Sequence, residues 1–149
     1  MILSTASVVW HRGLKDGKGT IGVPSGVLSE TPYSFASCFE DGQGTNPEEL
    51  LAAALAACFT MTLSARLVTL KFTPERVRTT ATVTLEFLNG AWTISKIALD
   101  VAAKVPRISE SALQAAAGDA KYCCPISRML NVHAVLNVRL ESQRGKLAE

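Results

Sequence analysis

The stretch GTNPEELLAAALAACF, at residues 44–59, decides the fold that the sequence predicts. Its first half carries the signals of a helix start, because Asn46 can cap the first turn and Pro47 suits the first helical position. Glu49 follows three residues after the cap, where a glutamate completes a capping box and complements the positive end of the helix. We therefore expect one long helix from Pro47 to about Leu70.

The segment Leu50–Phe59 of this helix is apolar on every side. A helix of this kind is normally buried all round. A single layer of a 149-residue chain can scarcely enclose it. We therefore expect the helix to be buried against a partner subunit.

Strands are expected on both sides of the helix. Ahead of it, we predict strands at Ser4–Trp10, Gly19–Val23 and Pro32–Glu40. After it, residues 80–88 alternate between apolar and polar side chains, as in a half-buried strand. Asn89-Gly90 supplies a type I′ turn into a return strand. The parity of the apolar residues shifts on the return strand, which indicates a β-bulge near Ser95-Lys96.

The C-terminal part predicts further elements: a helix at about Ser109–Tyr122, a short helix starting at Cys124-Pro125, and a strand at Val132–Leu140. Together, these elements indicate an α+β fold with antiparallel strands around one long, central, buried helix. The length fits one domain over residues 1–149.

Composition excludes several classes of protein. With 48% hydrophobic and 19% charged residues, the chain is not intrinsically disordered. A net charge of +2 and scattered basic residues argue against nucleic-acid binding. Polar residues interrupt the apolar run before it reaches the roughly 20 residues of a membrane span, so we expect no membrane association. The N-terminus lacks the basic region of a secretory signal. We expect a cytoplasmic protein, in which thiols stay reduced.

Reduced thiols make the cysteines candidates for chemistry. Position alone favours Cys58 as a small buried hydrophobe in the middle of the apolar helix. Cys124 has the better independent case, because a thiol at a helix N-terminus gains thiolate character. Capping or packing accounts for Cys124 equally well, and the neighbouring Cys123 is expected to pack.

Other kinds of catalytic site have little support in the sequence. The cysteines are single or adjacent, and His11 and His133 lie far apart, so the paired ligand spacing of a zinc site is missing. His133 falls on the polar face of the last predicted strand, where a solvated side chain is expected. The chain also lacks the Gly-x-Ser-x-Gly elbow of hydrolases and a glycine-rich phosphate loop.

Three motifs, Gly44–Leu50, Ala56–Phe59 and Cys124–Ser127, closely resemble those of the OsmC/Ohr family of bacterial thiol peroxidases. The likeness extends over nearly the whole chain. Residues 17–20, 25–28 and 93–99 resemble the osmotically inducible (OsmC) branch in particular.

The resemblance implies an intertwined homodimer with its site at the subunit boundary. It implies that Cys58 is the peroxidatic thiolate, which reduces an organic hydroperoxide to an alcohol and becomes a sulfenic acid. Cys124 would be the resolving thiol, which condenses with that sulfenic acid to a disulfide. An external dithiol reductant, such as a lipoylated protein in the Ohr branch, would restore both thiols. No metal, flavin or haem cofactor is implied, because the sulfur supplies the electrons.

Glu48 matches the family's glutamate that orients a catalytic arginine. Ten residues of helix place it roughly 15 Å from Cys58, too far for a carboxylate to span. A Glu48 that acts at Cys58 must therefore come from the partner's helix, packed antiparallel. Its other role is to complement the helix N-terminus.

The sequence departs from the family where OsmC proteins carry that arginine, because the residue there is Cys38. A nearby cation normally keeps a buried thiol ionised and stabilises the departing oxygen. In the Ohr branch the arginine comes from an earlier loop, where this chain has Arg12, Lys15 and Lys18. Lys15 is nearest in register, although solvated charge around a hairpin explains all three. Alternatively, Cys38 serves as an extra redox thiol.

Two functions follow from these observations. The first is a thiol-dependent peroxidase for organic hydroperoxides, active in oxidative and osmotic stress defence. The alternative is a catalytically weak or non-enzymatic OsmC-like stress or ligand-binding protein, because Cys38 stands in place of the arginine.

Overall fold

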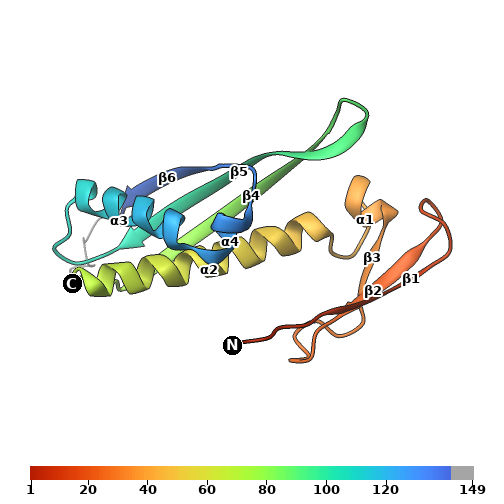
Figure 1. The fold of residues 1–149 in the computed structure, drawn as a ribbon, viewed down its shortest axis with the longest axis horizontal. Coiled ribbons are helices and arrows are strands. Elements are labelled where there is room, and N and C mark those ends of the chain that lie inside the picture. The colour runs from red at the N-terminus through yellow and green to blue at the C-terminus, as the bar shows by residue number, and fades with distance from the viewer. Residues whose placement is uncertain (142–149) are drawn as a thin grey trace, which may run out of the picture. The chain divides into compact units, whose positions relative to one another are not determined.

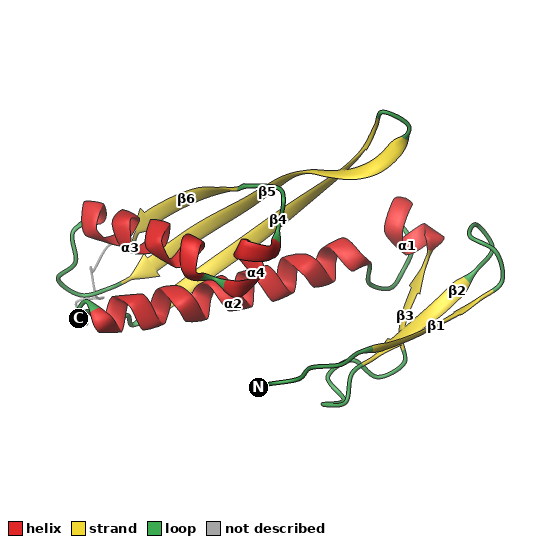
Figure 2. Ribbon diagram, in the orientation of Figure 1, coloured by secondary structure: helices red, strands yellow, loops and turns green. Residues whose placement is uncertain are grey.

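The computed structural model describes residues 1–141 of the chain. These residues form two compact units, which meet in sequence at Leu50 and Leu51. Figure 1 labels the elements of both units, and Figure 2 shows that each unit combines strands with helix. The fold is α+β, as the sequence predicts. A single domain over residues 1–149 stays a prediction.

The first unit contains a three-stranded antiparallel sheet in the order β1-β2-β3. Its strands are β1 (Ser7–His11), β2 (Lys18–Gly22) and β3 (Thr31–Ser34). The first two predicted strands are confirmed, with ends that shift by one to three residues. Trp10 and Tyr33 pack with ring centroids 5.1 Å apart. They meet over Gly19, where a Cβ would lie 2.4 Å from the Tyr33 ring.

The third predicted strand, Pro32–Glu40, is wrong beyond Ser34, because helix α1 (Phe35–Phe39) begins there. The Ser34 hydroxyl accepts the Ser37 N–H at 3.1 Å, and the Ser37 hydroxyl accepts the Ser34 N–H at 2.8 Å. This reciprocal capping box stabilises a helical turn despite the β-favouring aromatic residues around it. Cys38 consequently lies on a short helix and not on a strand.

The second unit contains the sheet β4-β5-β6. Its antiparallel hairpin consists of β4 (Arg76–Leu88) and β5 (Ala91–Lys104). Asn89 and Gly90 both have positive φ, 52° and 84°, which confirms the predicted type I′ turn. Thr84 pairs with Lys96 and Leu85 with Ile94, so Ser95 is the extra residue of the predicted bulge.

Strand β6 (Ala134–Leu140) pairs with β5 in parallel, which differs from the antiparallel pairing predicted for all strands. The reason is the connection between them, which contains α3 (Glu110–Cys123) and α4 (Pro125–Met129). A helical crossover returns the chain to the end of the sheet from which β5 started. Both predicted helices are confirmed, and Ser109 caps α3 by accepting the Ala112 N–H at 3.2 Å.

Helix α2 (Pro47–Thr69) confirms the predicted long helix. Asn46 caps it, because its side-chain oxygen accepts the Glu49 N–H at 2.7 Å. Four of its side chains, spaced four residues apart on one face, are fully buried: Leu55, Phe59, Leu63 and Leu67. They form one core with inward residues of β5, α3 and the α3–α4 corner, which include Ile97, Leu99, Val101, Leu113, Ala117 and Cys124.

The opposite face of α2 is apolar and exposed in the single chain. Met61 is 74% exposed and Val68 55% exposed, and Ala53, Ala57 and Ala65 are exposed beside them. The predicted burial on every side is therefore not reached within one chain. By length and composition alone, α2 could also cross a membrane. A core helix of a globular protein meets the same criterion, and four residues of α2 lie in the core described above.

Candidate active site

Cys58 and Cys124, which the sequence analysis singles out, both lie in the second unit. The structure brings them together. Cys58 lies midway along α2, and Cys124 precedes α4 as its N-cap residue. Their side chains are hydrogen-bonded to each other and pack in the same core. Cys124 is 0% exposed, whereas Cys58 is partly exposed. A reagent can therefore approach the pair through Cys58.

The corner between α3 and α4 fixes the position of Cys124. Its backbone N–H donates to the Ala120 carbonyl at 2.8 Å, which closes the last turn of α3. Its own carbonyl accepts the Arg128 N–H at 3.0 Å, which opens α4. Pro125 occupies the first position of α4, where its missing N–H is no loss. The backbone is thus bound on both sides of the thiol, and the sulfur faces the core.

Hydrogen-bond donors around Cys124 favour its thiolate. Burial raises the pKa of the Cys124 thiol, but donors from the Ser127 hydroxyl, the Ser127 and Ile126 backbone N–H groups and the Cys58 thiol outweigh burial, so the pKa lies below its ordinary value. The Ser127 hydroxyl is itself buried and has no nitrogen or oxygen partner. Its polar interaction is therefore with the sulfur.

The Cys58 thiol is shifted in the opposite direction. Burial raises the pKa of Cys58, and its hydrogen bond to Cys124 raises it further, while the Ile126 N–H and the Thr62 hydroxyl only partly offset these effects. Among residues 1–141, the groups that shift the Cys58 pKa include no cation. In the reduced pair the first proton therefore leaves Cys124, and Cys58 donates the hydrogen bond.

Sequence reasoning missed three of the surrounding donors. Ser127 stands three residues after the N-cap Cys124, a spacing that could have indicated a hydroxyl directed back at the cap. Thr62 stands four residues after Cys58 on α2, and its hydroxyl donates to the Cys58 carbonyl at 2.8 Å. Ile126 contributes through its backbone N–H, which no side-chain pattern signals.

A second group of candidate residues lies in the first unit, where α1 is bound to the start of α2. The Ser37 hydroxyl donates to the Thr45 carbonyl at 2.8 Å. The Asn46 side-chain amide donates to the Ser37 carbonyl at 3.2 Å. These bonds place Cys38 near enough to Glu48 for the carboxylate to act on the thiol.

The electrostatics of this group favour a neutral thiol at Cys38. Burial raises the pKa of Cys38 and the Glu48 carboxylate raises it further, while a hydrogen bond with Ser37 partly offsets them. Glu48 thus faces a thiol at the position where the family resemblance implies an arginine. A neutral thiol supplies none of the positive charge of that guanidinium.

Two further sequence candidates are Lys15 and Cys123. Lys15 is exposed in the connection between β1 and β2, and the interactions described for the first unit include none between Lys15 and Cys38 or Glu48. Cys123 is exposed at the end of α3. Within residues 1–141, no group of three or more His, Cys, Asp or Glu side chains could hold a metal ion.

Comparison with known proteins identifies the family. The sequence model for "OsmC-like protein" matches residues 40–139. The "Peroxiredoxin OsmC" of Escherichia coli (strain K12) is 44% identical over 133 residues, which cover 89% of this chain and 93% of that protein. The chain belongs to the OsmC-like family. The same identity and coverage hold for the "Peroxiredoxin OsmC" of Shigella flexneri.

Solved structures agree with this OsmC-like assignment at the level of the fold. The organic hydroperoxide resistance protein OhrB of Bacillus subtilis has a TM-score of 0.68 and 24% identity, and the match covers 92% of this chain and 98% of that one. An OsmC-like protein from Mycoplasma pneumoniae has a TM-score of 0.75 and 18% identity, with 95% and 99% coverage. The names of the curated relatives support a peroxidase-type redox role.

The Ser127 hydroxyl provides a test of the charge distribution in the pair. Replacing Ser127 by Ala removes a donor that stabilises the Cys124 thiolate, so the Cys124 pKa should rise and its thiolate should form at higher pH. The pH dependence of thiolate ultraviolet absorbance measures this shift. Ser111→Ala, a change at an exposed serine of α3, should leave the titration unchanged. An unshifted titration in Ser127→Ala would show that the hydroxyl does not act on Cys124.

Proposed function

We propose that this OsmC-like protein is a thiol-dependent peroxidase that reduces organic hydroperoxides to alcohols, with Cys58 as peroxidatic and Cys124 as resolving cysteine. The observation that carries the proposal is the hydrogen-bonded pair itself, with one sulfur partly exposed and the other buried. The partly exposed sulfur can meet a hydroperoxide, while the buried sulfur is in place to form the disulfide.

The first step is a proton transfer within the pair. The Cys124 thiolate accepts the Cys58 proton along their hydrogen bond, which creates the nucleophile on the accessible sulfur. The Cys58 thiolate then attacks the distal oxygen of the hydroperoxide, and the O–O bond breaks. The alkoxide takes the proton from the Cys124 thiol and leaves as the alcohol, so Cys58 becomes a sulfenic acid and Cys124 is again a thiolate.

The second step resolves that sulfenic acid. The Cys124 thiolate attacks the Cys58 sulfur, hydroxide leaves and is protonated to water, and a disulfide joins the two residues. An external dithiol then supplies two electrons and two protons and becomes a disulfide itself. A lipoylated protein is a suitable dithiol of this kind. We place the cycle in the cytoplasm, where thiols are kept reduced.

A second copy of the chain is the proposed cover for the exposed face of α2. That face is a continuous apolar stripe, with Ala53 and Ala57 near Met61 and with Val68 one to two turns further along. Small side chains permit another helix to approach closely, and an exposed apolar stripe of this kind marks an interaction surface. In the resulting homodimer, Glu48 and Cys38 of one copy would serve the Cys58 site of the other.

Charge placed at the centre of this face should separate the homodimer. Met61→Lys puts an ammonium group into an apolar contact, so the mass measured by light scattering should fall by about half, because a buried unpaired charge is strongly unfavourable. Gln114→Lys, at an exposed position of α3, should leave the mass unchanged. A wild-type protein that runs as a monomer would contradict the homodimer.

The cysteine roles predict distinct behaviour in three variants. Wild-type protein should consume cumene hydroperoxide with a dithiol reductant, and Cys58→Ser should abolish consumption. Cys124→Ser should accumulate a sulfenic acid at Cys58, detected by trapping and mass spectrometry, and should form it more slowly because the proton acceptor is gone. Cys123→Ser is the matched control and should retain wild-type turnover, since Cys123 is exposed and outside the pair.

The alternative function, a catalytically weak or non-enzymatic OsmC-like protein, is favoured by the environment of Cys38. The thiol and carboxylate there supply no cation. Absence of turnover in wild-type protein, together with no peroxide-induced Cys58–Cys124 disulfide, would establish this alternative and overturn the peroxidase.

Restoring the missing charge tests how much activity its absence removes. Cys38→Arg places a guanidinium beside Glu48, so hydroperoxide consumption should rise, by up to about a hundredfold if the gain matches that of a single transition-state donor. Steady-state kcat/KM measures the effect. Cys38→Ser is the control, because it removes the thiol without adding charge. A Cys38→Arg protein slower than wild type would indicate that Cys38 itself participates or that another cation fills the site.

A further inference from the structure

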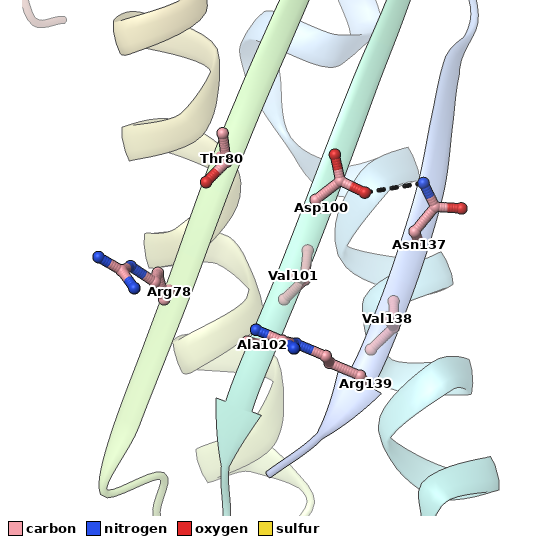
Figure 3. A pocket seen from close by; sticks show the side chains of 8 residues that line it. All are labelled: Arg78, Thr80, Asp100, Val101, Ala102, Asn137, Val138 and Arg139. Atoms are coloured by element: carbon pink, nitrogen blue, oxygen red, sulfur yellow. Dashed lines mark hydrogen bonds between the residues drawn. The ribbon is translucent and has the colours of Figure 1, made fainter.

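A cleft of about 440 Å³ lies on the outer face of the β4-β5-β6 sheet. Figure 3 shows it in front of the three strands, with α2 behind them. Core residues of β5, such as Leu99 and Val101, point toward the helices, whereas Asp100 and Ala102 alternate with them and face the cleft. The sheet therefore separates this cleft from the cysteine pair.

Strand register arranges the lining in two adjacent rows. Arg78, Ala102 and Arg139 are aligned across β4, β5 and β6, and Thr80, Asp100 and Asn137 form the next row. Because neighbouring strands lie about 4.8 Å apart, the two arginines start roughly 10 Å apart with one methyl group between them. In Figure 3 the Arg139 side chain extends across Ala102, which is only 4% exposed although it faces outward.

Carboxylates balance the positive charge of the arginine row only at longer range. Glu141 pairs with Arg76 at 2.7 Å, and Arg78 and Arg139 act on the same carboxylate only at longer range. Within residues 1–141, neither Arg78 nor Arg139 has an ion pair of its own. An anion over Ala102 would compensate Arg139, and arginine binds phosphate oxygens in bidentate fashion. The Arg78 side chain points away from β5 in Figure 3 and joins the anion by turning inward.

The second row offers hydrogen-bond acceptors. The Asp100 carboxylate accepts from the Asn137 side-chain amide at 2.9 Å, as Figure 3 shows. This leaves the second Asp100 oxygen, the Asn137 carbonyl oxygen and the Thr80 hydroxyl to receive donors. Hydroxyl groups suit these positions, whereas a second anionic group would be repelled by Asp100.

We propose that this cleft binds a small phosphate monoester of a polyol. The phosphate lies between Arg78 and Arg139, and the hydroxyl groups of the ligand donate to Asp100 and its neighbours in the second row. The site is independent of the peroxidase, because it depends on no cysteine and lies on the other face of the sheet.

Titration of the full-length protein with glycerol 3-phosphate tests the proposal, with amide chemical shifts followed at constant ionic strength. Saturable shifts should appear on β4, β5 and β6 around the cleft. Inorganic phosphate should bind more weakly, and glycerol alone should not bind. Arg78→Ala and Arg139→Ala should each weaken binding about tenfold or more, because each removes charge-assisted hydrogen bonds. Lys96→Ala, on the same sheet face but outside the cleft, should bind as wild type does.

Asp100→Asn tests the contribution of the second row to binding separately from that of the arginine row. It removes the negative charge but retains a hydrogen-bonding group, so inorganic phosphate should bind more tightly while the advantage of glycerol 3-phosphate over phosphate shrinks. Shifts that do not saturate, or that persist in both arginine variants, would overturn the site. A dicarboxylate such as succinate that binds as well as glycerol 3-phosphate would overturn the assignment to a phosphate monoester. Peroxidase assays on the same variants measure hydroperoxide consumption separately, so that a failure of ligand binding can be told from a failure of the proposed peroxidase function.

Discussion

The hydrogen bond between Cys58 and Cys124 is the contact on which the chemistry proposed for this OsmC-like chain depends. It joins two elements that are distant in sequence, the middle of α2 and the corner between α3 and α4. Packing of Leu55, Phe59 and Leu63 against the sheet fixes the rotation of α2 and therefore directs Cys58 toward that corner. The core holds the two sulfurs together, so a loss of packing in α2 would separate them.

Among the described residues, the groups that shift the pKa values of Cys58 and Cys124 include no cation. Donors from Ser127 and Ile126 make the buried sulfur the better anion, and the more accessible sulfur holds the proton. In a protein with a nearby guanidinium, the nucleophile would be ionised before the hydroperoxide arrives. Here burial raises the pKa of Cys38 and the Glu48 carboxylate adds to that effect, so the thiol is favoured in its neutral form. In the proposed cycle, hydrogen-bond donors would therefore replace a cation, because they stabilise the Cys124 thiolate that takes the proton from Cys58.

Much of this architecture could be predicted from local signals. The cap at Asn46, the Asn89-Gly90 turn and the bulge at Ser95 each follow from the residues at those positions, and all three are present. The strand predicted through Cys38 failed because a capping box of two serines outweighed the β-preference of the aromatic residues. The parallel pairing of β6 was missed because it depends on the path of a crossover, which strand periodicity does not encode.

In the candidate site, too, the sequence could predict residues that belong to local motifs but not contacts that depend on the folded chain. Motif resemblance pointed to Cys58 and Cys124, whereas position alone favoured a packing role for Cys58. The donors at Thr62, Ile126 and Ser127 could not be assigned, because their effect depends on where each group points in the folded chain.

The position of Cys124 in the crossover between β5 and β6 also affects the stability of the whole second unit. A covalent bond from this corner to α2 would close a loop through residues 58–124, which contains the complete β4–β5 hairpin and α3. Closing a loop of this length restricts the unfolded chain and stabilises the folded state by about 4 kcal/mol in the chain-entropy description. In each turnover, disulfide formation would then raise the free energy of unfolding and reduction would lower it again. The oxidised protein would therefore resist unfolding better than the reduced one.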